Sequence, residues 1–220
     1  SLLADGTDGQ SFTTLSFRSY RYIRLIVQTK SEPLIIDDLY GTFTGYPFEA
    51  NYIFNTDNPE IKQILDIGWR TARLNAWETY TDCPYYEQLQ YIGDTRIQAM
   101  ISYYNSGDDR LARNALSLMD RSRLTEGVTM SRYPTRSTQI ISTFSLWYIG
   151  MLYDYWMYRP DADFLKDKLM GQRAVLDFFA KYQQPDGSVK NLPYWRFVDW
   201  VGDMGWGPMG ADGSAAIYDI

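Results

Sequence analysis

The sequence predicts a mainly α-helical protein in which a short strand-forming segment precedes a series of helices. Within the first fifty residues, apolar and polar side chains alternate, which is typical of strands. From about residue 55 onward, apolar side chains recur at helical spacing. The connections between the expected helices alternate between long and short, which favours an up-and-down array. With 220 residues, the chain is long enough for one or two packed domains.

The composition excludes several classes of function. The chain has no histidine and a single cysteine, Cys83, so it contains no Ser-His-Asp triad, no imidazole base and no His- or Cys-cluster metal site. Its formal net charge of −6 argues against nucleic-acid binding, which needs clustered lysine and arginine. No apolar run approaches the ~18 residues of a membrane span. We therefore expect no cofactor, no metal, no nucleic acid and no membrane insertion.

The strand-forming segment begins with an alternating run over 20–27, where Ile23, Leu25 and Val27 share one face. Further short runs follow at 34–36 and 39–44. Two or three strands alone are marginal in water. The pattern therefore predicts the closing part of a larger β-sandwich.

The helices begin after a clear start signal. Asp57-Asn58-Pro59-Glu60 combines capping side chains with proline and an acid in the first turn. Apolar spacing then predicts a first helix from this signal to about Ala76. Further helices are expected at about 94–105, 108–122, 138–158 and 162–184, with a sixth beginning near Gly213.

The connections between these helices predict where a functional site would lie. Two of them, at 106–107 and 159–161, are tight hairpin links, whereas those at about 77–93, 123–137 and 185–212 are long. In an up-and-down array, alternate connections fall at the same end, so the three long ones should meet. Long loops over a rigid scaffold commonly carry function. The alternative is that they are simply tolerated insertions.

The first long connection carries three carboxylates, Asp82, Glu87 and Asp94, among several tyrosines. The pKa of a carboxyl group is raised by neighbouring acids and by burial. We therefore expect a glutamic acid that stays protonated and can donate its proton to a leaving oxygen. The aspartates would remain ionised and accept hydrogen bonds from substrate hydroxyls. Asp94 precedes an expected helix, so N-capping is an equal alternative for it.

Aromatic residues make up 16% of the chain, and flat rings with polar edges suit stacking on sugars. In the third long connection, Asp199 and Trp200 are candidates for a hydroxyl-binding acid and a stacking ring, with Trp195 and Trp206 as further candidates. In the second, Arg132 could reach the site, although a solvated arginine is the favoured interpretation.

The string Thr81-Asp82-Cys83-Pro84, followed by Glu87 and Gly93-Asp94, resembles the signature of α-L-rhamnosidases of glycoside hydrolase family 78. The strand at 17–23 and the pair Asp199-Trp200 are also similar to segments of that family. The resemblance implies that residues 1–50 are the C-terminal part of a β-sandwich. Residues 51–220 would be the N-terminal half of an (α/α)6 catalytic barrel.

The same resemblance implies inverting hydrolysis of terminal α-L-rhamnosyl groups, with Glu87 as general acid and the general base outside this segment. The implied partner is a rhamnose-containing carbohydrate, and the implied location is periplasmic or extracellular. Tyr85-Tyr86 stands where many members have Gln-Arg, and Tyr91 replaces the tryptophan that usually contacts the sugar. The alternatives are a non-catalytic carbohydrate-binding or structural module, or another (α/α)-barrel glycosidase.

Overall fold

The computed structural model describes residues 2–197, 199 and 200, and the chain divides into two compact units after Thr44. The described part of the first unit contains neither helix nor strand. The strands predicted over 20–27, 34–36 and 39–44 are therefore absent. Apolar side chains of the first run, such as Ile23 and Leu25, are about half exposed, so none of the described residues forms a core over them. Within the part of the chain that the structure describes, this segment has the strand pattern without the pairing that a ladder requires.

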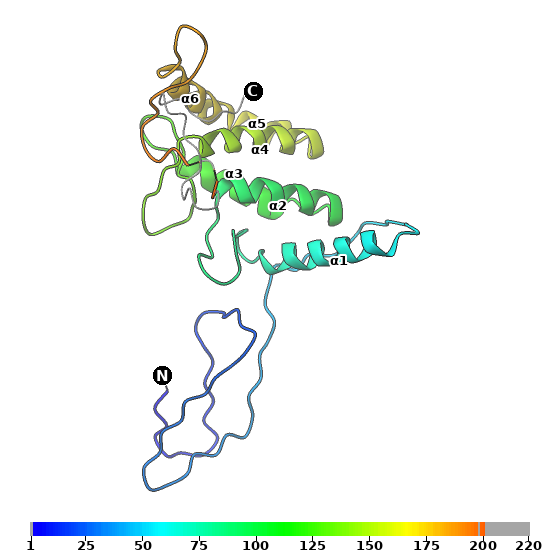
Figure 1. Cartoon of the computed structure of the whole chain (residues 1–220), viewed down its shortest axis with the longest axis vertical. Helices are drawn as coiled ribbons and strands as arrows, with labels where there is room; N and C mark the ends of the chain where they lie inside the picture. The colour runs from blue at the N-terminus through cyan, green and yellow to red at the C-terminus, as the bar shows by residue number, and fades with distance from the viewer. Residues whose placement is uncertain (1, 198, 201–220) are drawn as a thin grey trace. The chain divides into compact units, whose positions relative to one another are not determined.

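The second unit is helical, and the expectation of a mainly helical chain is confirmed (Figure 1). Its described part contains six helices: α1 (Pro59–Leu74), α2 (Ile92–Asn105), α3 (Arg110–Arg121), α4 (Phe144–Tyr158), α5 (Ala162–Lys166) and α6 (Leu169–Ala180). None of them is long and apolar enough to span a bilayer.

The start of α1 forms as its sequence predicts. The Asn58 side chain accepts a hydrogen bond of 2.9 Å from the backbone N–H of Glu60, and Pro59 occupies the first turn. The cap satisfies one of the backbone donors that every helix leaves unpaired at its start. Local sequence alone therefore fixes this helix boundary.

Two helix boundaries differ from the sequence prediction because of tertiary contacts. The helix expected over 162–184 is divided into α5 and α6, and Lys168 between them turns inward to contact Asp120. The helix expected from residue 138 begins only at Phe144. Here Ile141 forms a parallel bridge with Trp195, so this stretch pairs with a distant segment instead of winding into α4. The helix expected near Gly213 lies outside the described residues.

The core lies between α2, α3 and α4, where small side chains such as Ala99, Ala112 and Ala115 are fully buried. A salt bridge joins α2 to α4: Arg96 Nε lies 2.5 Å from Asp154 Oδ2. A Cβ atom on Gly150 would lie 2.5 Å from Arg96 Nη1, so glycine at this position leaves the space that the arginine occupies. Packing and charge together fix how these helices cross.

The described parts of the long connections meet at one end of the helices, as the alternation of short and long connections predicts (Figure 1). An antiparallel bridge between Tyr91 and Arg132 joins the first long connection to the second. The bridge between Ile141 and Trp195 joins the second to the described part of the third. Residues from three distant parts of the sequence are thereby brought to one place.

Candidate active site

The first long connection contains a turn whose ends are tied together. The N–H of Asp82 donates to the carbonyl of Leu89, and the N–H of Leu89 donates to Asp82 Oδ1, both at 2.9 Å. Within the turn, the N–H of Glu87 donates to Cys83 Sγ at 3.3 Å. Asp82, expected to bind substrate, therefore also holds the shape of the turn that carries Glu87.

Backbone pairing fixes the second long connection against the first. The N–H of Tyr133 donates to the carbonyl of Gln90, and the N–H of Ile92 donates to the carbonyl of Ser131. The fully buried Gln90 side chain adds a hydrogen bond of 2.8 Å from its Nε2 to the Tyr133 carbonyl. The residue enclosed by this pairing, Arg132, is thus held beside the first connection.

Arg132 is the site residue that sequence reasoning misjudged. The structure leaves only 17% of its side chain exposed, so the interpretation as a solvated arginine is wrong. Its Nη1 donates to the Tyr91 hydroxyl at 2.6 Å and lies 3.8 Å from Glu87 Oε2. The pairing that creates these contacts joins segments about forty residues apart, so no local sequence pattern predicts it.

Glu87 occupies an environment that differs from the expected one. Its side chain is 49% exposed, and the Arg132 guanidinium lies beside it, with 3.8 Å between Arg132 Nη1 and Glu87 Oε2. Burial, together with a hydrogen bond to the Glu87 carboxylate, raises the pKa of Tyr91 to about 12. The Tyr91 hydroxyl therefore stays protonated at neutral pH and can act as a hydrogen-bond donor.

Asp94 is the carboxylate that the structure places in acidic surroundings. Burial raises its pKa above the ordinary value, and the charges of Asp82, Asp199 and Glu87 raise it further. The capping alternative is not what the structure shows, since α2 begins two residues earlier and Tyr91 occupies the N-cap position. The other three acids proposed from the sequence are thus close enough to Asp94 to raise its pKa.

The third long connection contributes exposed rings to the same end. Trp200 is well exposed, and its ring centroid lies 5.1 Å from that of Phe197. Phe197 lies 6.3 Å from Phe144, which in turn lies 6.5 Å from Tyr91. Asp199 accepts a hydrogen bond from the Trp200 N–H at 2.7 Å. A chain of aromatic contacts therefore links this connection to the first, while Trp206 lies outside the described residues.

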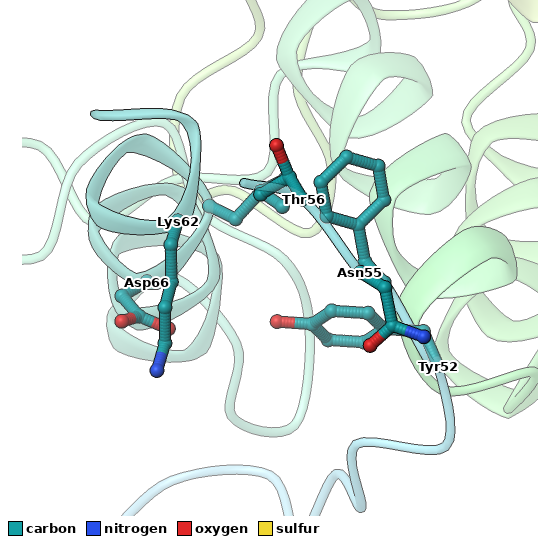
Figure 2. Close-up of a pocket in the computed structure, with 7 residues that line it drawn as sticks. Tyr52, Asn55, Thr56, Lys62 and Asp66 are labelled. Carbon is teal, nitrogen blue, oxygen red and sulfur yellow. The ribbon is translucent and has the colours of Figure 1, made fainter. Parts of the chain in front are cut away.

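A hollow elsewhere in the second unit has different chemistry. It encloses about 280 Å³ between α1 and the segment that precedes it. Figure 2 shows Lys62 and Asp66 projecting from α1, with Tyr52 and Asn55 on the segment opposite. With Asp66 as its one acid, it lacks the pair of carboxylates that acid–base hydrolysis of a sugar needs.

The long-connection end thus combines four carboxylates, a neutral phenol, a guanidinium and exposed rings. These groups can move protons, bind hydroxyls and stack on sugar faces. Among the residues that the structure describes, no group of three or more metal-ligating side chains occurs. These features define a domain of helical hairpins with an acid-rich candidate site at one end.

Comparison with known families identifies the domain more closely. Residues 49–215 match the family described as the bacterial α-L-rhamnosidase six-hairpin glycosidase domain. Because the match covers most of the chain, the chain belongs to this family. A comparison with curated proteins finds no match.

Solved structures agree with this fold. The chain resembles a GH78-family rhamnosidase of Bacillus sp. GL1 with a TM-score of 0.66 and 22% identity, over 71% of this chain and 16% of that one. It resembles a rhamnosidase from Klebsiella oxytoca with rhamnose bound, with a TM-score of 0.62 and 20% identity, over 71% of this chain and 31% of that one. An α-L-rhamnosidase from Dictyoglumus thermophilum gives 0.57 and 22%, over 70% and 18% of the two chains. The chain therefore spans less than a third of each of these proteins.

Proposed function

We propose that the protein containing this chain hydrolyses terminal α-L-rhamnosyl groups of glycans or glycosides with inversion of configuration. The observation that supports this most directly is the meeting of Asp82, Glu87, Asp94 and Asp199 at one end of a rhamnosidase-family domain. The family indicates the substrate class. The cluster of carboxyl groups fits the reaction type, because hydrolysis of a glycosidic bond uses two carboxyl groups.

In the proposed reaction, the Glu87 carboxyl donates its proton to the glycosidic oxygen as the bond to the anomeric carbon breaks. A water molecule attacks that carbon from the opposite face and gives a proton to a second carboxylate. That base lies ~6.5–9.5 Å from the acid in inverting enzymes, and the resemblance assigns it to sequence outside this segment. Asp94, Tyr91 and Asp199 bind sugar hydroxyls, and Trp200 stacks on the ring.

A second candidate for the acid follows from the electrostatics of the site. Glu87 lies beside a guanidinium, whereas burial and neighbouring carboxylates raise the pKa of Asp94. A carboxyl group that keeps its proton at higher pH is better prepared to act as a general acid. Glu87 remains the first choice because it occupies the acid's place in the family signature.

Leaving-group dependence separates the two assignments. In the full-length protein, Glu87→Gln should reduce turnover of an alkyl α-L-rhamnoside by about 10²–10⁴-fold, because a poor leaving group needs protonation. Turnover of a 2,4-dinitrophenyl rhamnoside, whose leaving group needs no proton, should fall far less. Asp94→Asn is the matched control and should reduce both alike. The opposite pattern would transfer the acid role to Asp94, and unchanged activity on both substrates would overturn the proposal for Glu87.

We also propose that residues 51–220 form the first half of an (α/α)6 barrel and residues 1–50 the end of a β-sandwich. The family match over 49–215 supports the first part, and the alternating pattern of 20–27 supports the second. A periplasmic or extracellular location remains a proposal drawn from the same resemblance. Fractionation of cells that express the full-length protein would test it.

A further inference from the structure

Two neighbouring tyrosines at the tip of the first connection are not used by the proposed reaction. Tyr85 is 60% exposed and Tyr86 is 85% exposed, although both rings are large and apolar. Their centroids lie 4.7 Å apart at an interplanar angle of 77°, so the edge of one ring meets the face of the other. This arrangement leaves ring faces open to a ligand.

The turn holds these rings in place before any ligand arrives. The reciprocal hydrogen bonds between Asp82 and Leu89 close its base. The Gln88 side chain donates from Nε2 to the Pro84 carbonyl at 3.0 Å, and the Glu87 N–H donates to Cys83. A ligand that stacks on the rings therefore loses little free energy to ordering of the backbone.

The position of the rings relative to Glu87 indicates which part of a substrate they would meet. Tyr85 and Tyr86 directly precede Glu87 in the same turn and are exposed. Arg132, which contacts Tyr91 and lies 3.8 Å from Glu87 Oε2, has only 17% of its side chain exposed. A general acid protonates the oxygen that joins the cleaved sugar to its leaving group. Exposed rings next to the acid in the same turn are therefore suited to contact the leaving group.

We propose that Tyr85 and Tyr86 form the leaving-group subsite of this enzyme and bind a leaving group that presents a flat apolar face. A pyranose ring and an aromatic aglycone both present such a face. The inference rests on the proposed rhamnosidase activity. It adds the chemical nature of the leaving group, which the activity alone does not specify.

The test compares three α-L-rhamnosides that differ only in the leaving group: a rhamnosyl-glucose disaccharide, the 4-nitrophenyl rhamnoside and rhamnosyl fluoride. Fluoride is too small to stack, so it reports on the reaction without the subsite. The variants of the full-length protein are Tyr85→Ala, Tyr86→Ala and the double variant. Tyr85→Phe and Tyr86→Phe are matched controls that keep the rings.

We expect each alanine variant to lose about tenfold in kcat/KM on a substrate whose leaving group stacks on the rings. Removing a ring removes both the apolar surface that the leaving group buries and the stacking contact itself. Hydrolysis of rhamnosyl fluoride and inhibition by free rhamnose should change less than twofold, and the phenylalanine variants should resemble the parent. Loss on the disaccharide alone identifies a sugar leaving group, and loss on the aryl substrate alone identifies an aromatic aglycone.

Equal kcat/KM of parent and double variant on both large substrates would overturn the subsite, as would an equal loss on rhamnosyl fluoride. These results leave the proposed function standing, because the parent still hydrolyses rhamnosides. If the parent hydrolyses none of the three substrates, the proposed function fails and the subsite fails with it.

Discussion

Acidic residues lie at both ends of the helical unit, but their pKa values are lowered at one end and raised at the other. At the end with the short links, Asp108 is paired with Arg110 and accepts a hydrogen bond from Tyr46, and Asp161 is paired with Arg113. Hydrogen bonds from these arginines hold the pKa of both aspartates below the ordinary value. Both of these aspartates have an arginine partner, which indicates a structural role.

At the end with the long connections, several carboxylates lie close enough to raise the pKa of one of them, Asp94. Burial and the charges of Asp82, Asp199 and Glu87 raise the pKa of Asp94, and Arg132 is the cation that the described residues place beside Glu87. Such uncompensated charge costs stability, and it is typical of sites where protons are moved. The contrast shows that the role of an acidic residue in this chain depends on whether a cation lies beside it.

The largest expected effect separates the two ends by activity. Asp94→Asn in the full-length protein should reduce kcat/KM for rhamnosides by about 10²–10³-fold, because it replaces a charged, half-buried acceptor of sugar hydroxyls with a neutral amide. Asp108→Asn makes the same chemical change at the other end and should leave kcat/KM within about twofold. Steady-state kinetics on 4-nitrophenyl rhamnoside measures both, and similar losses would contradict the division between the two ends.

A smaller effect tests the arginine at the site. Arg132→Met removes the hydrogen bond to Tyr91 and the charge beside Glu87, so kcat/KM should fall by about tenfold. Arg136 on the same connection is exposed, and Arg136→Met should have no effect beyond about twofold. Arg132→Lys should restore part of the loss if the charge matters. An Arg132→Met enzyme as active as the parent would show that the contacts have no part in positioning Tyr91.

The smallest effect is on how stability depends on pH. The pKa of Asp94 is raised from 3.8, so its contribution to stability is present at lower pH and is lost as pH rises above that value. The pKa of Asp108 is lowered from 3.8, so its contribution is present above that value and is lost as pH falls below it.

Urea unfolding at pH 3 and pH 7 measures this difference. On going from pH 3 to pH 7, the free energy of unfolding of Asp94→Asn should rise relative to the parent, and that of Asp108→Asn should fall. Shifts of the same sign in the two variants would show that the two aspartates occupy similar surroundings.

Three of the candidate acids could be proposed from the sequence because they lie in a short string whose spacing is local. Glu87 and Asp94 could be proposed from that string, and the alternation of link lengths predicted that Asp199 would come to the same end. Arg132 could not be identified in this way. Its partners depend on backbone pairing between two connections, and that pairing has no signature within either one.

The sequence by itself determined the helical periodicity, the start of α1 at Asn58 and the end at which the long connections meet, because these depend on neighbours within a few residues or on the order of the elements. Tertiary structure alone decided that the inward turn of Lys168 separates α5 from α6, that Arg132 is buried against Tyr91, and that the pKa of Asp94 is raised. These outcomes depend on residues that are far apart in the sequence but close in space, and sequence spacing does not give those distances.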